Sequence, residues 1–155
     1  MASAKTRGKV IRGVRSNLRG GLVQDFNEIT LVSGQSVTLD ADVYESRIKT
    51  NGSGAMICLL PITSTTKPLK LGQRHLVTYL VEQAANDSVR IQGATSGQIV
   101  HEGFVISGVT NYTQAVFAQV DLFSGGDAAL FEYKGIVTAS GTWNLLYLQG
   151  TAIPS

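Results

Sequence analysis

Apolar and polar residues alternate with a period of two along most of this chain, and this pattern restricts it to strand-based folds. Residues 35–40 read QSVTLD, and residues 74–82 keep the alternation for nine positions. Turn-forming pairs such as Ser96-Gly97 and Ser140-Gly141 separate these segments at short intervals. No segment combines a 3.6-residue apolar period with capping residues. The pattern therefore predicts an all-β protein.

The spacing of the turns predicts about ten short strands. We expect strands at residues 35–40, 46–50, 55–60, 74–82, 88–92, 98–101, 104–107, 115–123, 130–137 and 142–148, and a loop at 62–71. Many short strands with glycine turns and without helical crossovers are typical of antiparallel sandwiches and barrels. A chain of 155 residues suits one domain. We expect an antiparallel, jelly-roll-like sandwich over residues 25–155.

Charge is unevenly distributed along the chain. The first 20 residues contain six basic residues, and no acidic residue precedes Asp25. The remaining residues carry 7 basic and 11 acidic groups, so a segment of charge +6 precedes a body of charge −4. Glycine at positions 8 and 13 disfavours a stable helix there. We expect residues 1–24 to form a flexible, extended arm that orders against a partner.

Aliphatic residues are interspersed among the basic residues of this arm, at Val10, Ile11, Val14 and Leu18. A tail that only improves solubility is the alternative interpretation, but it has no need of aliphatic side chains. Their rough helical spacing leaves a short induced helix open. The mixture of basic and aliphatic residues therefore predicts that the arm docks on another macromolecule.

The sequence also bears on compartment and on cysteine chemistry. The basic N-terminal segment lacks a continuous apolar core, and the longest apolar run, residues 55–60, is too short to span a bilayer. We expect synthesis in a host cytoplasm and no membrane partner.

Cys58 is the single cysteine, so no intrachain disulfide is possible, and its apolar neighbours predict a buried thiol.

The sequence contains no convincing set of catalytic or metal-binding residues. His75 alternates with valines on a predicted strand, and His101 precedes a turn, so neither has a metal-ligand companion at the required spacing. Asp40 and Asp42 lack the glycine and the closing glutamate of a calcium loop, which favours a solvated strand end. The glycines at 125 and 126 do not lead into a helix, so no phosphate site is expected. We predict no enzyme activity, no cofactor and no metal.

Aromatic residues concentrate near the C-terminus of the sequence, at Phe117, Phe123, Phe131, Tyr133, Trp143 and Tyr147. An exposed set of this kind would suit a sugar or a single-stranded nucleic acid. Strand alternation buries about half of such residues, so we expect them mainly in the core.

The order of several motifs resembles that of the small β-sandwich decoration (cement) and head-fibre proteins of tailed bacteriophages. These motifs are MICLLP at 56–61, GQRHLVTYLVE at 72–82, VRIQG at 89–93, VFAQVDLF at 116–123, GGD at 125–127, GTW at 141–143 and YLQG at 147–150. The resemblance covers residues 37–150. Residues 127–138 form a longer insertion than in that pattern, and the basic arm is not a general feature of these proteins.

This resemblance implies a structural virion protein that binds the outer capsid surface as a homotrimer and stabilises the shell. The implied partners are two further copies of the chain and the major capsid protein. The arm residues expected to dock on the capsid are Lys5, Arg7, Lys9, Val10, Ile11, Arg12, Arg15, Leu18 and Arg19.

Three other functions remain open from the sequence. A viral shell protein would use the basic arm to bind packaged nucleic acid, with steep salt dependence. A fibre tip or carbohydrate-binding module would use the aromatic residues and the polar loop at 62–68. An enzyme, such as a small cupin-like barrel, would need more convergent histidines than this chain contains.

Overall fold

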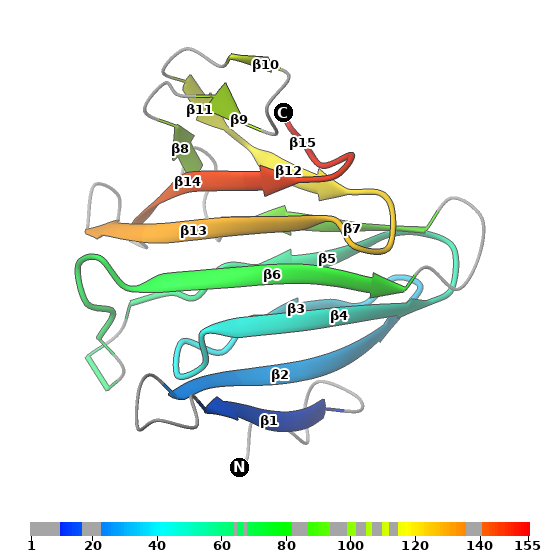
Figure 1. Ribbon diagram of the computed structural model, residues 1–155, viewed down its shortest axis with the longest axis horizontal. Coiled ribbons are helices and arrows are strands. Elements are labelled where there is room, and N and C mark those ends of the chain that lie inside the picture. The colour runs from blue at the N-terminus through cyan, green and yellow to red at the C-terminus, as the bar shows by residue number, and fades with distance from the viewer. Residues whose placement is uncertain are drawn as a thin grey trace.

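The computed structural model describes residues 10–16, 23–63, 65–66, 68–81, 87–93, 99–101, 105–106, 110–111, 115–135 and 141–155. These residues form strands and turns, and two sheets pack face to face around one apolar core (Figure 1). The predicted all-β sandwich is confirmed. Within the described ranges, no helix is long and apolar enough to cross a membrane.

The larger sheet has eight strands in the order β1-β2-β4-β6-β13-β14-β8-β11. Their bounds are β1 Val10–Ser16, β2 Val23–Val32, β4 Glu45–Asn51, β6 Arg74–Val81, β13 Ala128–Gly135, β14 Thr142–Gln149, β8 Ile99–His101 and β11 Ala115–Phe117. β1 is the outermost strand on one side, next to β2.

The smaller sheet has five strands in the order β15-β12-β7-β5-β3. Their bounds are β15 Ile153–Pro154, β12 Gln119–Leu122, β7 Asp87–Gln92, β5 Gly54–Leu59 and β3 Ser36–Thr38. A separate two-stranded pair is formed by β9 (Val105–Ile106) and β10 (Thr110–Asn111).

Both sheets are mixed, so the prediction of an antiparallel sandwich is wrong in this respect. β2, β4 and β6 are parallel neighbours in the large sheet, and β3, β5 and β7 are parallel neighbours in the small sheet. From β2 to β7 the chain changes sheet at every turn, so each strand lies beside the strand two places earlier and runs in the same direction. Turn residues mark a reversal of the chain, but they do not tell whether the next strand joins the same sheet.

A second difference concerns the predicted strand at residues 115–123. It divides at Ala118 into β11, which belongs to the large sheet, and β12, which belongs to the small sheet. Strands that change sheets are a known way to close the corner of a sandwich. The alternation continues across Ala118, and for this reason the sequence predicts a single strand.

The core contains the inward-facing residues of both sheets. Its largest fully buried side chains are Trp143, Tyr79, Phe131, Ile29, Leu31, Leu39, Ile48, Met56, Leu60, Ile91 and Ile99. The indole Nε1 of Trp143 donates a hydrogen bond to the carbonyl oxygen of Pro61 at 3.2 Å, so its polar atom is satisfied. Cys58 is fully buried, as predicted, and burial raises the pKa of its thiol to about 12.

Part of the predicted arm, residues 1–24, lies within the described residues. Val10–Ser16 form β1, which pairs antiparallel with β2 from Val10 opposite Ile29 to Ser16 opposite Val23. β2 itself begins at Val23, before the predicted start of the body at residue 25. Part of the basic segment therefore extends the large sheet as its edge strand and is not helical.

Candidate interaction surfaces

The outward face of the small sheet is named here the small-sheet face. Its side chains follow from strand alternation, because Met56, Val89 and Val120 point into the core and their neighbours point outward. Its members are Ser36, Thr38, Ala55, Ile57, Leu59, Ser88, Arg90, Gln92, Gln119, Asp121 and Ile153. Only two of these side chains are charged.

The two charged groups bind each other across neighbouring strands. Nε of Arg90 on β7 donates to Oδ1 of Asp121 on β12 at 2.8 Å. Nε2 of Gln119 donates to the other carboxylate oxygen at 2.8 Å, and Gln92 donates to Gln119 at 3.4 Å. The four side chains form a hydrogen-bonded cluster that leaves the face without net charge.

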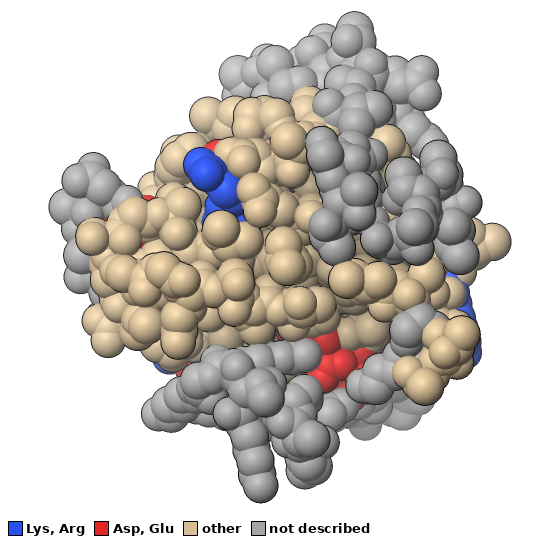
Figure 2. Space-filling view, turned by 180° about the vertical axis from the view of Figure 1, so that it is seen from behind, with Lys and Arg blue, Asp and Glu red and all other residues tan. Residues whose placement is uncertain are grey.

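Apolar side chains flank this cluster. Ile153 is 51% exposed, and its register opposite Asp121 places it on the small-sheet face. Phe123 follows β12 directly and is 41% exposed, while Ile57 and Leu59 on β5 are half-buried. Figure 2 shows that the visible surface on this side of the molecule is mostly neither acidic nor basic.

The outward face of the large sheet has the opposite character, because its charged side chains form ion pairs, one within β4 and two between neighbouring strands. Glu45 binds Arg47 at 2.9 Å, and Glu132 binds Arg74 at 3.1 Å. The guanidinium of Arg47 also lies 3.8 Å from the ring centroid of Phe26, a cation–π geometry. A third pair joins Lys49 on β4 to Glu28 on β2. This face therefore carries more charged side chains than the small-sheet face.

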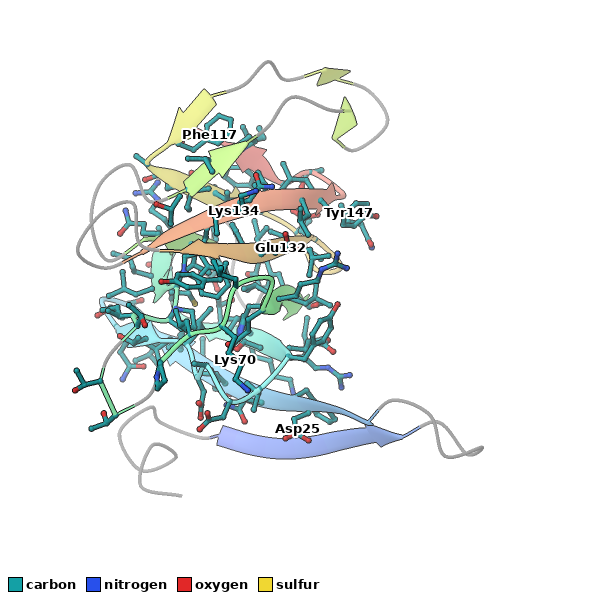
Figure 3. The ribbon with its side chains drawn as sticks, turned by 90° about the vertical axis from the view of Figure 1, so that its left-hand side faces the viewer. Asp25, Lys70, Phe117, Glu132, Lys134 and Tyr147 are labelled. Carbon is teal, nitrogen blue, oxygen red and sulfur yellow. The ribbon has the colours of Figure 1, made fainter. Side chains whose placement is uncertain are left out.

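The loop between β5 and β6 lies at one end of the sandwich, the end that faces the viewer in Figure 3, where Lys70 is labelled. It is fixed by hydrogen bonds from Gly72 N to Tyr133 O at 2.9 Å and from Gln73 Nε2 to Ala41 O at 2.7 Å. Leu71 protrudes from this fixed turn with 75% of its surface exposed. Open hollows of about 710 and 450 Å³ border it. The larger is lined by Asp42, Thr66, Lys70 and Gln73 together with apolar residues, whereas the smaller is mainly apolar.

The other end is held by Asp127. One of its oxygens accepts hydrogen bonds from the backbone N–H groups of Phe123 and Ser124 at 2.9 and 3.0 Å and from the hydroxyl of Thr151 at 2.7 Å. Its other oxygen accepts from the N–H of Thr151 at 2.9 Å. Burial acts to raise the pKa of Asp127, but these hydrogen bonds to the carboxylate outweigh it and hold the pKa below its ordinary value. Asp127 thus joins two turns and has a structural role.

The residues considered for catalysis or metal binding occupy structural positions. His75 is buried, and its Nε2 lies 2.9 Å from Oγ of Ser46, in agreement with a satisfied core histidine. Asp40 is buried rather than solvated, and its Oδ1 accepts the N–H of Asp42 at 3.0 Å, which closes a turn. His101 is the last residue of strand β8, in agreement with the predicted strand at residues 98–101. The described part of the chain contains no group of three or more potential metal ligands.

The clustered aromatic residues are mainly in the core, as predicted. Trp143, Phe131, Tyr133 and Phe117 are buried, at 9% exposure or less. Two aromatic residues remain exposed, but Tyr147 lies on β14 of the large sheet whereas Phe123 follows β12 of the small sheet. The six aromatic residues of this cluster therefore share no common platform.

The predicted docking residues are only partly within the described residues. Val10, Ile11, Arg12 and Arg15 belong to β1, and Lys5, Arg7, Lys9, Leu18 and Arg19 lie outside the described residues. The Arg90–Asp121 pair is not evident from the sequence. The alternation of residues 88–92 signals that Arg90 faces outward, but only the sheet register places Asp121 opposite it.

Comparison with known proteins does not assign a family. No protein-family model matches the chain, and no curated protein matches it significantly.

Proposed function

We propose that this chain is a structural virion protein, a decoration (cement) protein of a tailed bacteriophage that binds the outer capsid surface as a homotrimer and stabilises the shell. The resemblance of the motifs between residues 37 and 150 suggests the class. The proposal that the chain docks through its basic segment rests on where this segment lies in the fold. β1 contains Arg12 and Arg15 and is the edge strand of the large sheet, so these two basic residues belong to the perimeter of the sandwich.

This location suits attachment to another protein. An edge strand presents backbone N–H and C=O groups that a strand of a second protein can pair with. Basic side chains on and before the edge strand would add attraction to an acidic capsid surface. In a trimer, the three arms would together carry about 18 positive charges by sequence. Three linked contacts of modest strength gain on the order of 10²–10⁴ in avidity.

The first prediction tests the arm with two charge-matched variants. In one variant, Lys5, Arg7 and Lys9 are replaced by Gln, and these positions precede β1, so the strand itself stays unchanged. In the control variant, Lys67, Lys70 and Lys134 of the body are replaced by Gln, which removes the same charge. The measurement is co-sedimentation with capsids of the encoding phage from which the decoration layer has been removed. We expect the arm variant to bind at least about tenfold more weakly, whereas the control binds like the unchanged protein.

Equal binding by both variants would contradict docking through the arm. The nucleic-acid alternative has a separate signature, because it predicts binding of the isolated protein to duplex DNA with a salt slope near −5 for about six phosphate contacts. That result, together with a location of the protein inside the particle, would replace the decoration proposal by an internal shell function.

A further inference from the structure

We infer that the turn at residues 70–73, named here the leucine turn, and the apolar hollow beside it form a docking site for an acidic segment of another protein. The segment carries one large apolar side chain between carboxylates. This inference goes beyond the proposed capsid attachment, which is assigned to the basic arm, and does not depend on it.

The leucine turn holds Leu71 in a fixed position at the surface. The N–H of Gln73 donates to the carbonyl oxygen of Lys70 at 3.0 Å and closes the turn, and Gly72 adopts a φ of +80°, which glycine tolerates. The backbone of Tyr133 on β13 binds the turn twice, at 2.9 Å through the N–H of Gly72 and at 2.8 Å through the carbonyl oxygen of Gln73. Leu71 is nevertheless 75% exposed. A large apolar side chain that is already held in place binds a partner with little loss of conformational entropy.

The smaller hollow beside Leu71, of about 450 Å³, has room for a large side chain of a partner. Its lining residues are Thr63, Pro68, Leu69, Leu71, Tyr133 and Gly135. Gly135 leaves space for the leucine, because a Cβ atom at that position would lie 3.0 Å from Cδ2 of Leu71. None of the lining side chains is charged, so the hollow favours an apolar group.

The charge around the leucine turn indicates that the partner is acidic. Residues 46–81 contain five basic residues and no acidic one. Three of the five bind carboxylates on the outward face of the large sheet. The other two, Lys67 and Lys70, belong to the loop that bears the turn, and within the described residues no ion pair joins Lys70 to a carboxylate. An acidic partner would neutralise this charge.

Two further charged residues border the site. Lys134 is exposed and directly precedes Gly135 of the apolar hollow, and it is labelled together with Lys70 in Figure 3. Asp42 lines the larger hollow but not the apolar one, so its carboxylate is not part of the surface that receives the apolar side chain.

These features favour a protein segment over a nucleic acid or a bilayer. A nucleic acid is bound through many phosphate contacts and gains nothing from an apolar hollow. A bilayer surface is bound through a larger continuous apolar area than one leucine at the tip of a turn. An acidic segment with one large apolar side chain uses both the hollow and the lysines.

Four fluorescent pentapeptides test the site on the full-length protein. The first has the sequence Asp-Asp-Leu-Asp-Asp; in the other three, Asn replaces Asp, Lys replaces Asp, or Ser replaces Leu. Fluorescence anisotropy measures the affinity, and amide chemical shifts of the isotope-labelled protein measure the location. We expect the acidic leucine peptide to shift the signals of residues 69–73 and 135 and to bind at least about tenfold more tightly than the other three.

Substitutions at exposed positions separate the two parts of the site. Leu71→Ser is expected to weaken binding of the acidic leucine peptide at least about tenfold, whereas Leu71→Met keeps a large apolar side chain and should bind like the unchanged protein. Ile153→Ser is the matched control, because Ile153 is an exposed aliphatic residue on β15 of the small sheet. Lys70→Glu is expected to shift the preference from the Asp peptide toward the Lys peptide. Near-ultraviolet circular dichroism verifies that each variant is folded.

Three results would overturn the inference: equal affinity for all four peptides, no chemical-shift change at the leucine turn, or full binding by a folded Leu71→Ser variant. Shifts at residues 69–73 caused by phosphatidylglycerol vesicles, but not by the peptide, would replace the protein partner by a membrane surface. The same shifts on raising the protein concentration alone would replace it by a second copy of the chain. Loss of capsid attachment with peptide binding intact would affect only the proposed function.

Discussion

Asp127 is the side chain on which one end of the sandwich depends. It accepts hydrogen bonds from the turn after β12 and from Thr151 in the turn after β14, so a single carboxylate joins two segments that are distant in sequence. Gly150 allows this contact, because a Cβ atom at that position would lie 2.1 Å from Oδ1 of Asp127. The backbone φ of Gly150 is +77°, a conformation that favours glycine.

The prediction at this scale is that Asp127→Asn destabilises the protein in a pH-dependent manner. The amide keeps one acceptor oxygen but turns an N–H donor toward backbone donors, so we expect a loss of about 1–3 kcal/mol in the free energy of unfolding at pH 7. Because folding lowers the pKa of Asp127 below 3.8, its contribution is present above that pH and disappears as the pH falls through the folded-state pKa. The difference between the two proteins should therefore shrink in strong acid.

Urea titrations at pH 7 and at pH values below 3.8 measure this difference. Asp42→Asn, at an exposed position, is the control and is expected to change stability little at either pH. A difference that stays constant down to the lowest pH would show that the charge of Asp127 is not the cause.

At the scale of the elements, the pairing of β13 with β14 depends on Gly141, the residue directly before β14. The ladder contains two irregularities, one of them between Tyr133 and Gly135. Gly141 precedes β14 with a φ of +89°, and a Cβ atom there would lie 2.5 Å from the ring of Tyr133. The ring of Tyr133 in turn lies 5.4 Å from that of Trp143 in the core. The backbone at Gly141 is therefore coupled to the packing of Tyr133 and Trp143 in the core.

We expect Gly141→Ala to reduce stability more than Gly126→Ala. Both positions have a positive φ, so each substitution costs about 1–2 kcal/mol in backbone strain. Only Gly141 has atoms in the way of a new Cβ, since nothing lies within 4 Å of the Cβ position at Gly126. Thermal unfolding of the two variants measures the additional loss, and a larger effect at Gly126 would contradict the packing argument.

On the scale of the whole molecule, the sandwich has two unlike outer faces and a basic edge. Three ion pairs of the described residues lie on the large sheet, a fourth, Arg90–Asp121, belongs to the neutral cluster on the small sheet, and β1 closes one edge. The two outer faces of the sandwich therefore differ in chemistry, and each can be altered by substitution without changing the other.

We predict that removal of residues 1–16, which includes β1, leaves the two-sheet core folded. The buried apolar residues in the described part of the chain begin at Ile29 and belong to the elements that remain. β2 would become the new edge strand, so a modest loss of stability is expected. Near-ultraviolet circular dichroism reports the environment of buried Trp143, and loss of that signal would show that β1 is required for the core.

Several features were predictable from the sequence because they are local. The apolar run at residues 55–60 predicted the buried thiol of Cys58, and strand alternation predicted most of β6. The segment 23–32 was assigned in part to the arm, because the basic run obscured the start of its alternation. The buried state of Asp40 was missed, since a polar residue at a strand end is usually solvated.

The sequence alone determined the all-β class, the turn at residues 124–127 and the difference in charge between a basic segment and an acidic body, because periodicity and charge are properties of neighbouring residues. Only the tertiary structure decided that β2, β4 and β6 run parallel, that Arg90 meets Asp121 and that Asp127 receives Thr151. These features join residues about 20 or more positions apart, and they depend on which sheet each strand enters after its turn. Strand alternation specifies which side of a strand is buried, but it does not specify the neighbouring strand.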